Sequence, residues 1–323
     1  MAQTFNFDRL YSQQDTGDVL GPIQFLRRWL VLRILRSYLP GANARVNARD
    51  NARGHASNGR YSVLEAGCGL GNLSLALAKQ GYRVDACDLS AAAIRKARSR
   101  VTRGPRPNFF VADAARLCPP ATQVTGTCEA GPESDSLREH VLPWCQNQRR
   151  SAGHLNDCPG SAARCSVRCR YDAVLCLEVL EHVSDDAGMV RNLAKCLRPG
   201  GILVCSVPHS MELWSVSDDV MGHLRRYTRQ EVRGVLEGAG LSVKRLFTWG
   251  YPLVKTYADW RRTTARPVRG YSESGQGVEM YTPRGVLMTL YQHLAFVLNR
   301  VFLLDVLFLN RGEGIGIIGV ACK

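Results

Sequence analysis

Short apolar runs alternate with amphipathic helical patterns from Tyr61 to the end of the chain. The runs are bounded by turn residues, which is typical of buried strands. The predicted strands cover 61–67, 82–90, 108–114, 171–178, 201–208, 241–249 and 314–323. The predicted helices cover 72–81, 91–101, 185–201 and 228–240, the last with a capping box. Since strands that alternate with helices form parallel sheets, the pattern predicts a doubly wound α/β domain.

Three segments fall outside this alternation. Residues 23–39 combine four arginines with large apolar residues, which indicates a basic amphipathic helix that packs on the domain or faces lipid. Residues 118–170 hold six of the twelve cysteines without a sustained period, and 251–310 are mostly helical in pattern. We therefore expect an N-terminal helix and low-complexity linker over 1–60, followed by one domain over 61–323 with a Cys-rich insertion and a helical cap.

A glycine-rich turn follows the first predicted strand. Gly67, Gly69 and Gly71 stand between a strand and a helix, where missing side chains let a ligand approach the backbone. The dinucleotide fingerprint would need a fourth glycine where this chain has Asn72. Asp88, at the end of the second strand, is placed to accept hydrogen bonds from ribose hydroxyls.

These motifs resemble those of class I S-adenosylmethionine-dependent methyltransferases. The similarity covers the segment from Glu65 to Gly71, the acid Asp88 after the second strand and the acid Asp113 after the third. It implies a seven-stranded sheet of order 3-2-1-4-5-7-6 with an antiparallel last strand, and S-adenosylmethionine as the cofactor. The cofactor-binding residues that it implies are Glu65, Gly67, Gly69, Gly71, Asp88, Leu89, Asp113, Ala114 and Leu177.

The end of the fourth strand carries a second motif. Glu178, Glu181 and His182 would share one face if this segment were helical. The pattern resembles one in ubiquinone-biosynthesis O-methyltransferases and small-RNA 2′-O-methyltransferases, which implies a divalent cation (Zn, Mn, Fe or Mg) held by these three residues and His223. The alternative is metal-free, with His182, His223 and Glu181 acting as base or ordering the acceptor.

Other polar residues near this motif are open to two interpretations. His209, after the fifth strand, is a pocket residue or a loop residue. Arg225, Arg226 and Tyr227 would bind a phosphate or sugar, or form a solvated basic turn. A second candidate metal site, at spacings irregular for zinc, would use His154, Cys158, Cys165 and Cys169.

Charge and composition add limits on location and partners. The net charge of +14 favours an anionic partner, namely nucleic acid, a phosphorylated substrate or a membrane surface. The first ten residues lack a secretion signal, and the apolar run 285–310 is broken by polar and charged side chains. We expect a cytoplasmic protein, either free or in peripheral contact with a membrane.

The resemblance implies an O-methyltransferase that acts on a small amphipathic acceptor such as a quinone precursor, phenol, glycolipid or sugar. The first alternative is an RNA 2′-O-methyltransferase, which the charge and the metal pattern favour, although no separate RNA-binding module is visible. The second is a catalytically silent module that binds S-adenosylmethionine. The pattern does not determine the oligomeric state.

Overall fold

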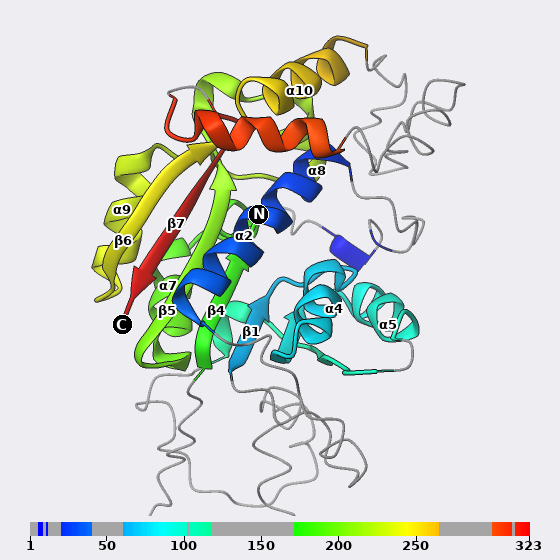
Figure 1. Cartoon of the computed structure of the whole chain (residues 1–323), viewed down its shortest axis with the longest axis vertical. Helices are drawn as coiled ribbons and strands as arrows, with labels where there is room; N and C mark the ends of the chain where they lie inside the picture. The colour runs from blue at the N-terminus through cyan, green and yellow to red at the C-terminus, as the bar shows by residue number, and fades with distance from the viewer. Residues whose placement is uncertain are drawn as a thin grey trace, which may run out of the picture.

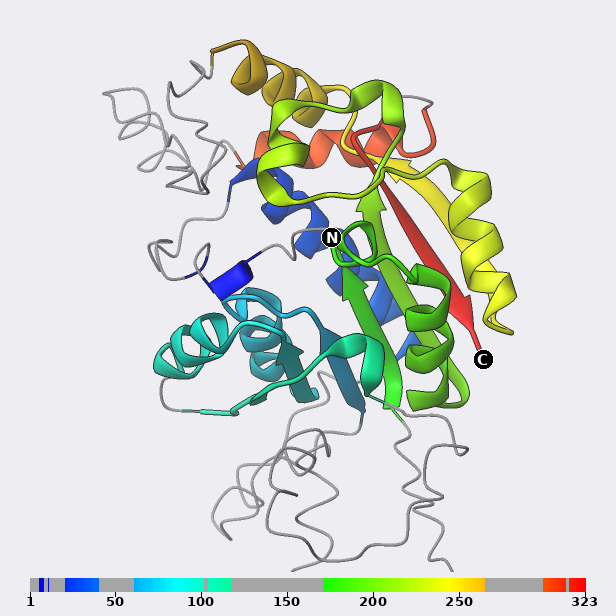
Figure 2. The same ribbon diagram turned by 180° about the vertical axis from the view of Figure 1, so that it is seen from behind.

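A seven-stranded sheet forms the centre of the computed structural model (Figures 1 and 2), in the order β3-β2-β1-β4-β5-β7-β6. The structure describes residues 6–8, 11, 21–40, 61–101, 104–117, 171–264, 299–311 and 314–323. The strands are β1 (Ser62–Ala66), β2 (Arg83–Asp88), β3 (Asn108–Val111), β4 (Tyr171–Leu177), β5 (Leu197–Pro208), β6 (Ser242–Trp249) and β7 (Gly316–Cys322). All neighbouring pairs are parallel except those that β7 makes with β5 and β6. The predicted strand order and the antiparallel last strand are confirmed.

Helices cover both faces of the sheet (Figures 1 and 2). On one face, apolar residues of three helices share a core with the sheet: α2 (Pro22–Tyr38), α4 (Asn72–Lys79) and α5 (Ala91–Ser99). On the other face, a second core is closed by α7 (Asp186–Cys196) and α9 (Arg229–Gly238). The α/β fold is therefore a three-layer arrangement, with a buried sheet between two helical layers.

The N-terminal helix α2 packs on the domain. Leu26, Leu30, Val31 and Leu35 recur at helical spacing and are at most 3% exposed, within the same core as the first strands. Pro22 lies in the first turn, where its missing N–H costs no helical hydrogen bond. The apolar stripe of this helix therefore faces the sheet, as in the first of the two interpretations of 23–39.

The start of α9 agrees with the prediction from the sequence, and the end of α7 does not. The capping box of α9 is confirmed, since Thr228 and Glu231 bond each other's backbone N–H groups. The predicted helix over 185–201 was too long at its C-terminal end. The chain becomes extended at Leu197, which pairs with Tyr171 of β4 before a register shift, so this pairing ends the helix before the Pro-Gly-Gly sequence.

Between β6 and β7, the described residues include α10 (Leu253–Thr264) and the 3-10 helix η6 (Phe302–Phe308). Figure 1 shows both beyond the carboxyl ends of β4 and β5. Asp305 is fully buried and accepts the backbone N–H groups of Leu253 and Val254, which fixes the start of α10 against η6.

Several predicted segments lie outside the described residues: the linker over 41–60, the whole Cys-rich insertion over 118–170 with its candidate metal ligands, and 265–298 of the cap. Among the helices that the structure describes, none combines the length and the apolar character needed to cross a bilayer.

Candidate active site

The glycine turn joins β1 to α4 with three residues in left-handed conformations. Gly67, Gly69 and Gly71 have φ values of 76°, 50° and 72°. A Cβ at Gly67 would collide with Val179, and one at Gly71 would lie 2.6 Å from Phe109. Glycine is therefore required here by both the backbone angle and the close packing.

Asp88 ties this turn to the end of β2. Its Oδ2 accepts the N–H of Gly69 at 2.7 Å, and its Oδ1 accepts the N–H of Ser90 at 2.9 Å. Burial raises the pKa of Asp88, and these backbone hydrogen bonds oppose the rise. Each carboxylate oxygen keeps a second lone pair, so Asp88 can hold the turn and still accept a hydrogen bond from a ligand.

Glu65 lies beneath the turn. It is 5% exposed and accepts a hydrogen bond from the hydroxyl of Ser74 in α4. Burial raises its pKa to about 7. The side chain therefore braces β1 against α4.

The other residues expected to bind the cofactor lie at the carboxyl edge of the sheet. Leu89 is 56% exposed and follows β2. The side chain of Asp113 is 37% exposed and accepts the N–H of Ala115 at the start of η1 (Ala114–Arg116). Ala114 and Leu177 are half-buried and pack against the two cores. Leu89 and Asp113 thus follow strands on one side of β1, and Leu177 ends β4 on its other side.

The described N-terminal residues also reach this edge, which the sequence patterns did not indicate. Asp8 accepts hydrogen bonds from the Ser90 hydroxyl and the Ala92 N–H, at 2.6 and 2.9 Å. The Tyr11 hydroxyl lies 2.9 Å from where a Cβ on Gly69 would stand. Burial and the charge of Asp88 raise the pKa of Tyr11, so its hydroxyl stays protonated.

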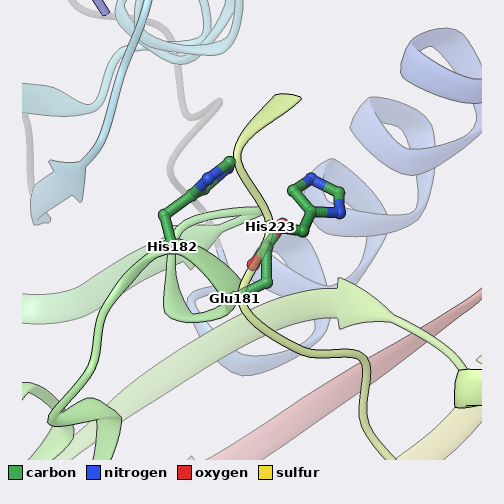
Figure 3. Close-up of side chains that lie close together, drawn as sticks. All are labelled: Glu181, His182 and His223. Carbon is green, nitrogen blue, oxygen red and sulfur yellow. The ribbon is translucent and has the colours of Figure 1, made fainter. Parts of the chain in front are cut away.

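A carboxylate and two imidazoles gather beyond the end of β4 (Figure 3). One ligand atom from each of Glu181, His182 and His223 lies within 4.8 Å of the other two. Glu181 is fully buried, and neither of its carboxylate oxygens has a hydrogen-bond partner among the described residues. Burial and the neighbouring Glu178 raise its pKa well above the ordinary value. The cluster therefore contains a buried carboxyl group that, among the described residues, has no hydrogen-bond partner for either side-chain oxygen and whose ionisation is disfavoured.

Each of the two histidine rings is held by a hydrogen bond at its own Nδ1. His182 Nδ1 is 3.2 Å from the carbonyl oxygen of Gly222, and His223 Nδ1 is 2.7 Å from Asp218 Oδ1. The rings meet edge to face with centroids 4.8 Å apart. Burial and the nearby His223 lower the pKa of His182 to about 4, so His182 is neutral at neutral pH.

The fourth residue of the expected metal set, Glu178, is placed differently. It is not on a helix with Glu181, because it has a φ of 55° and only Leu180–His182 forms a 3-10 turn, η4. Its carboxylate pairs with Arg27 of α2 at 2.9 Å and accepts the hydroxyl of Ser206 at 2.7 Å. The helical-face prediction was therefore wrong for Glu178, which lies outside the cluster of three.

The remaining candidates are engaged within the protein. His209 Nδ1 bonds the carbonyl oxygen of Gly314 at 2.9 Å. Arg225 pairs with Asp186, and Arg226 makes two contacts to Asp218 at 2.8 and 2.9 Å. Tyr227 is buried and donates to the carbonyl oxygen of Leu180 or to Asp186. The solvated basic turn does not describe these residues, which fasten the turn around His223; binding of a phosphate or sugar by them stays a prediction.

Comparison with curated proteins finds distant relatives. The chain is 31% identical over 144 residues to the ubiquinone biosynthesis O-methyltransferase of Xylella fastidiosa, covering 45% of this chain and 40% of that protein. It is 27% identical over 176 residues to the Idiomarina loihiensis enzyme of the same name, covering 53% and 54%. The matched region thus spans about half the length of these relatives.

Solved structures with related folds include magnesium protoporphyrin IX methyltransferase from Synechocystis, at 20% identity and a TM-score of 0.40, covering 74% of this chain and 84% of that one. Another is phosphoethanolamine N-methyltransferase 2 from Haemonchus contortus, at 13% identity and a TM-score of 0.48, covering 99% and 60%. The family model described as a methyltransferase domain matches residues 31–246, about two thirds of the chain. The chain belongs to this methyltransferase domain family.

Proposed function

We propose that the protein is an S-adenosylmethionine-dependent O-methyltransferase whose acceptor hydroxyl is bound at a divalent cation held by Glu181, His182 and His223. The observation that carries this proposal is the state of Glu181. A fully buried carboxylate without a hydrogen-bond donor is costly unless a cation compensates it. Perturbed carboxylates of this kind are concentrated at functional sites.

The donor side of the proposal rests on residues that suit the parts of S-adenosylmethionine. The left-handed turn at Gly67, Gly69 and Gly71, between a strand and a helix, is the kind of backbone on which a ligand can be bound without interference from side chains of the turn itself. Asp88 can accept from ribose hydroxyls through its remaining lone pairs, and the exposed face of Leu89 suits the adenine ring. The charge of Arg27, half-buried beside Glu178, suits the carboxylate of the donor.

The acceptor side offers one carboxylate and two imidazoles. This donor set suits Zn²⁺, Mn²⁺ or Fe²⁺, whereas Mg²⁺ prefers oxygen ligands. When bound, such a cation lowers the pKa of a coordinated hydroxyl and fixes the position of its oxygen. Glu181 supplies the negative charge, and His182, neutral at neutral pH, can offer a lone pair without losing a proton first. In-line alignment of donor and acceptor is then the main remaining requirement.

The surroundings of the cluster favour an amphipathic acceptor. Leu224 directly follows His223, is 54% exposed, and donates its N–H to the carbonyl oxygen of Glu181 at 2.7 Å. Phe7 meets the ring of His182 edge-on, with ring centroids 5.2 Å apart. Met211 is 55% exposed, and its sulfur contacts the N–H of Arg226. A small phenol, quinone precursor or glycolipid would place its hydroxyl at the cluster and its apolar part on these side chains.

The test is turnover of labelled S-adenosylmethionine with catechols, phenols, glycans and RNA 3′ ends, with and without a chelator. The proposal predicts transfer to a small hydroxyl compound that stops with chelator and returns when Zn²⁺ or Mn²⁺ is added. Preferential transfer to RNA 3′ ends would support the RNA alternative. Donor binding without transfer to any acceptor would support the silent module.

A further inference from the structure

We propose that one short turn, residues 215–223, fixes the tautomers of both site histidines, with Asp218 as the positioning residue for His223 and the Gly222 carbonyl for His182. Both rings then carry hydrogen on Nδ1 and keep Nε2 free of hydrogen as the atom available to a metal ion. This inference rests on the proposed function, since it explains how the residues of that site are oriented. Second-shell partners of this kind set the orientation and basicity of histidine ligands.

Asp218 can only accept hydrogen bonds, and it is surrounded by donors. It is 1% exposed and lies in α8 (Val216–Met221). Its Oδ2 accepts from the N–H and hydroxyl of Ser215 at 2.8 and 3.0 Å and from Arg226 at 2.9 Å. Its Oδ1 accepts from Arg226 Nε at 2.8 Å and faces His223 Nδ1 at 2.7 Å.

Two consequences follow for Asp218 and His223. Both oxygens of Asp218 accept from Arg226, so the carboxylate has no hydrogen to offer to a ring nitrogen. His223 Nδ1 must therefore carry the hydrogen that points at Asp218. In a neutral imidazole with this tautomer, Nε2 carries the lone pair.

Gly222 does the same for His182 through its backbone. A carbonyl oxygen can only accept, so the 3.2 Å contact requires hydrogen on His182 Nδ1. Gly222 ends α8 with a φ of 70°, a conformation that aims this carbonyl and that favours glycine. The turn is also fastened to η4, because the N–H of Leu224 donates to the carbonyl oxygen of Glu181. Together with the neighbouring Leu224, this segment contacts Glu181 and His182 and carries His223 itself.

The direct test is the imidazole nitrogen spectrum of ¹⁵N-labelled, metal-free protein at pH 8, with His182→Ala and His223→Ala used to assign the signals. Both histidines are expected as the Nδ1–H tautomer. Finding His223 protonated on Nε2 would overturn the proposal. This measurement needs neither metal nor activity, so it stands even if a variant fails to fold.

The second test compares Asp218→Asn with Asp219→Asn by Zn²⁺ titration. An amide at 218 must turn its NH₂ toward existing donors, so either His223 adopts the other tautomer or the contacts to Ser215 and Arg226 are lost. We expect a 10- to 100-fold loss of Zn²⁺ affinity. Asp219 is exposed, is in the same helix and accepts a side-chain hydrogen bond from Trp214, so its variant makes the same charge change and should stay within twofold.

The outcomes separate the two proposals. Equal losses in both variants, or unchanged affinity in a folded Asp218→Asn protein, would overturn the positioning role and leave the metal site standing. A wild-type protein that binds no Zn²⁺ and transfers no methyl group, yet shows both Nδ1–H tautomers, would remove the proposed function and keep the positioning role.

Discussion

The donor edge and the acceptor edge of the sheet differ in how their polar groups are satisfied. At the donor edge, Asp88 is bonded by two backbone N–H groups, and Asp8 is bonded by Ser90 and Ala92. At the acceptor edge, Glu181 is fully buried, yet neither of its side-chain oxygens has a partner among the described residues. Under the proposed function, the donor edge satisfies its polar groups within the chain, whereas the acceptor edge is completed by a cation.

The largest effect is expected when the negative charge of the Glu181 side chain is removed. Glu181→Gln is expected to lower kcat/KM about 10²- to 10³-fold, the loss typical of one electrostatic group that acts on the reacting atoms. Donor affinity should stay within twofold, because the donor edge is intact. Steady-state kinetics and donor titration measure the two effects, and Glu237→Gln, an exposed change on α9, is the matched control. Unchanged turnover in Glu181→Gln would remove the distinction between the edges.

The reciprocal change is Asp88→Asn. An amide must place its NH₂ against the N–H of Gly69 or of Ser90, so the glycine turn loses a charge-assisted hydrogen bond. We expect donor affinity to fall about 10- to 100-fold while Zn²⁺ affinity is unchanged. Asp85→Asn is the control, since Asp85 lies on the same strand three residues before Asp88. Its carboxylate accepts hydrogen bonds from Asn108 and Tyr171 and not from the glycine turn. Equal losses in the two variants would show a general effect on β2.

A smaller effect concerns stability and pH in the presence of chelator. The folded Glu181 carboxyl keeps its proton to a higher pH than the unfolded one, whose ordinary pKa is 4.5. Above that value the unfolded state binds fewer protons, so the free energy of unfolding falls as pH rises. Glu181→Gln lacks this loss and should be more stable than wild type by about 1–3 kcal/mol at pH 8, with a smaller difference at pH 5. Urea unfolding at pH 5 and pH 8 measures the free energy of unfolding of both proteins. A difference between variant and wild type that becomes smaller from pH 5 to pH 8 would contradict the account.

The smallest effect is expected for Glu178→Gln. Because Glu178 bonds Arg27 and Ser206 and lies outside the cluster, its replacement should change Zn²⁺ affinity by less than about threefold. Isothermal titration calorimetry with Zn²⁺ measures the affinity of Glu178→Gln, with Glu181→Gln titrated in parallel for comparison. A loss as large as that of Glu181→Gln would show that Glu178 turns from Arg27 to complete a four-residue site.

The two edges also differ in how far the sequence predicted them. The donor edge lies within two consecutive strand-turn-helix units, so Gly67, Gly69, Gly71 and Asp88 could be read from local spacing. The strand order followed from the resemblance, whereas the alternation of strands and helices predicted only a doubly wound α/β domain. Short-range patterns were sufficient wherever the neighbours in space are also neighbours in sequence.

The acceptor edge depends on contacts between distant segments. Glu178 lies three residues before Glu181, a spacing that would put both on one face of a helix. Its backbone is instead left-handed, and its side chain pairs with Arg27, about 150 residues earlier in the chain. No sequence pattern indicated a role for Asp218. Its role depends on the folded structure, in which Ser215, His223 and Arg226 all lie within hydrogen-bond distance of its carboxylate. The pattern of 23–39 did not pair Arg27 with Glu178, because helical periodicity cannot reveal which acid of a distant segment an arginine meets.

Co²⁺ titration of purified, metal-free protein, followed by visible absorption, tests the central claim most directly. The account predicts one equivalent bound, with ligand-field bands that are absent in Glu181→Gln and strongly weakened in His182→Ala and His223→Ala. Absence of binding in the wild-type protein, or binding that is the same in all three variants, would contradict a cation site at Glu181, His182 and His223.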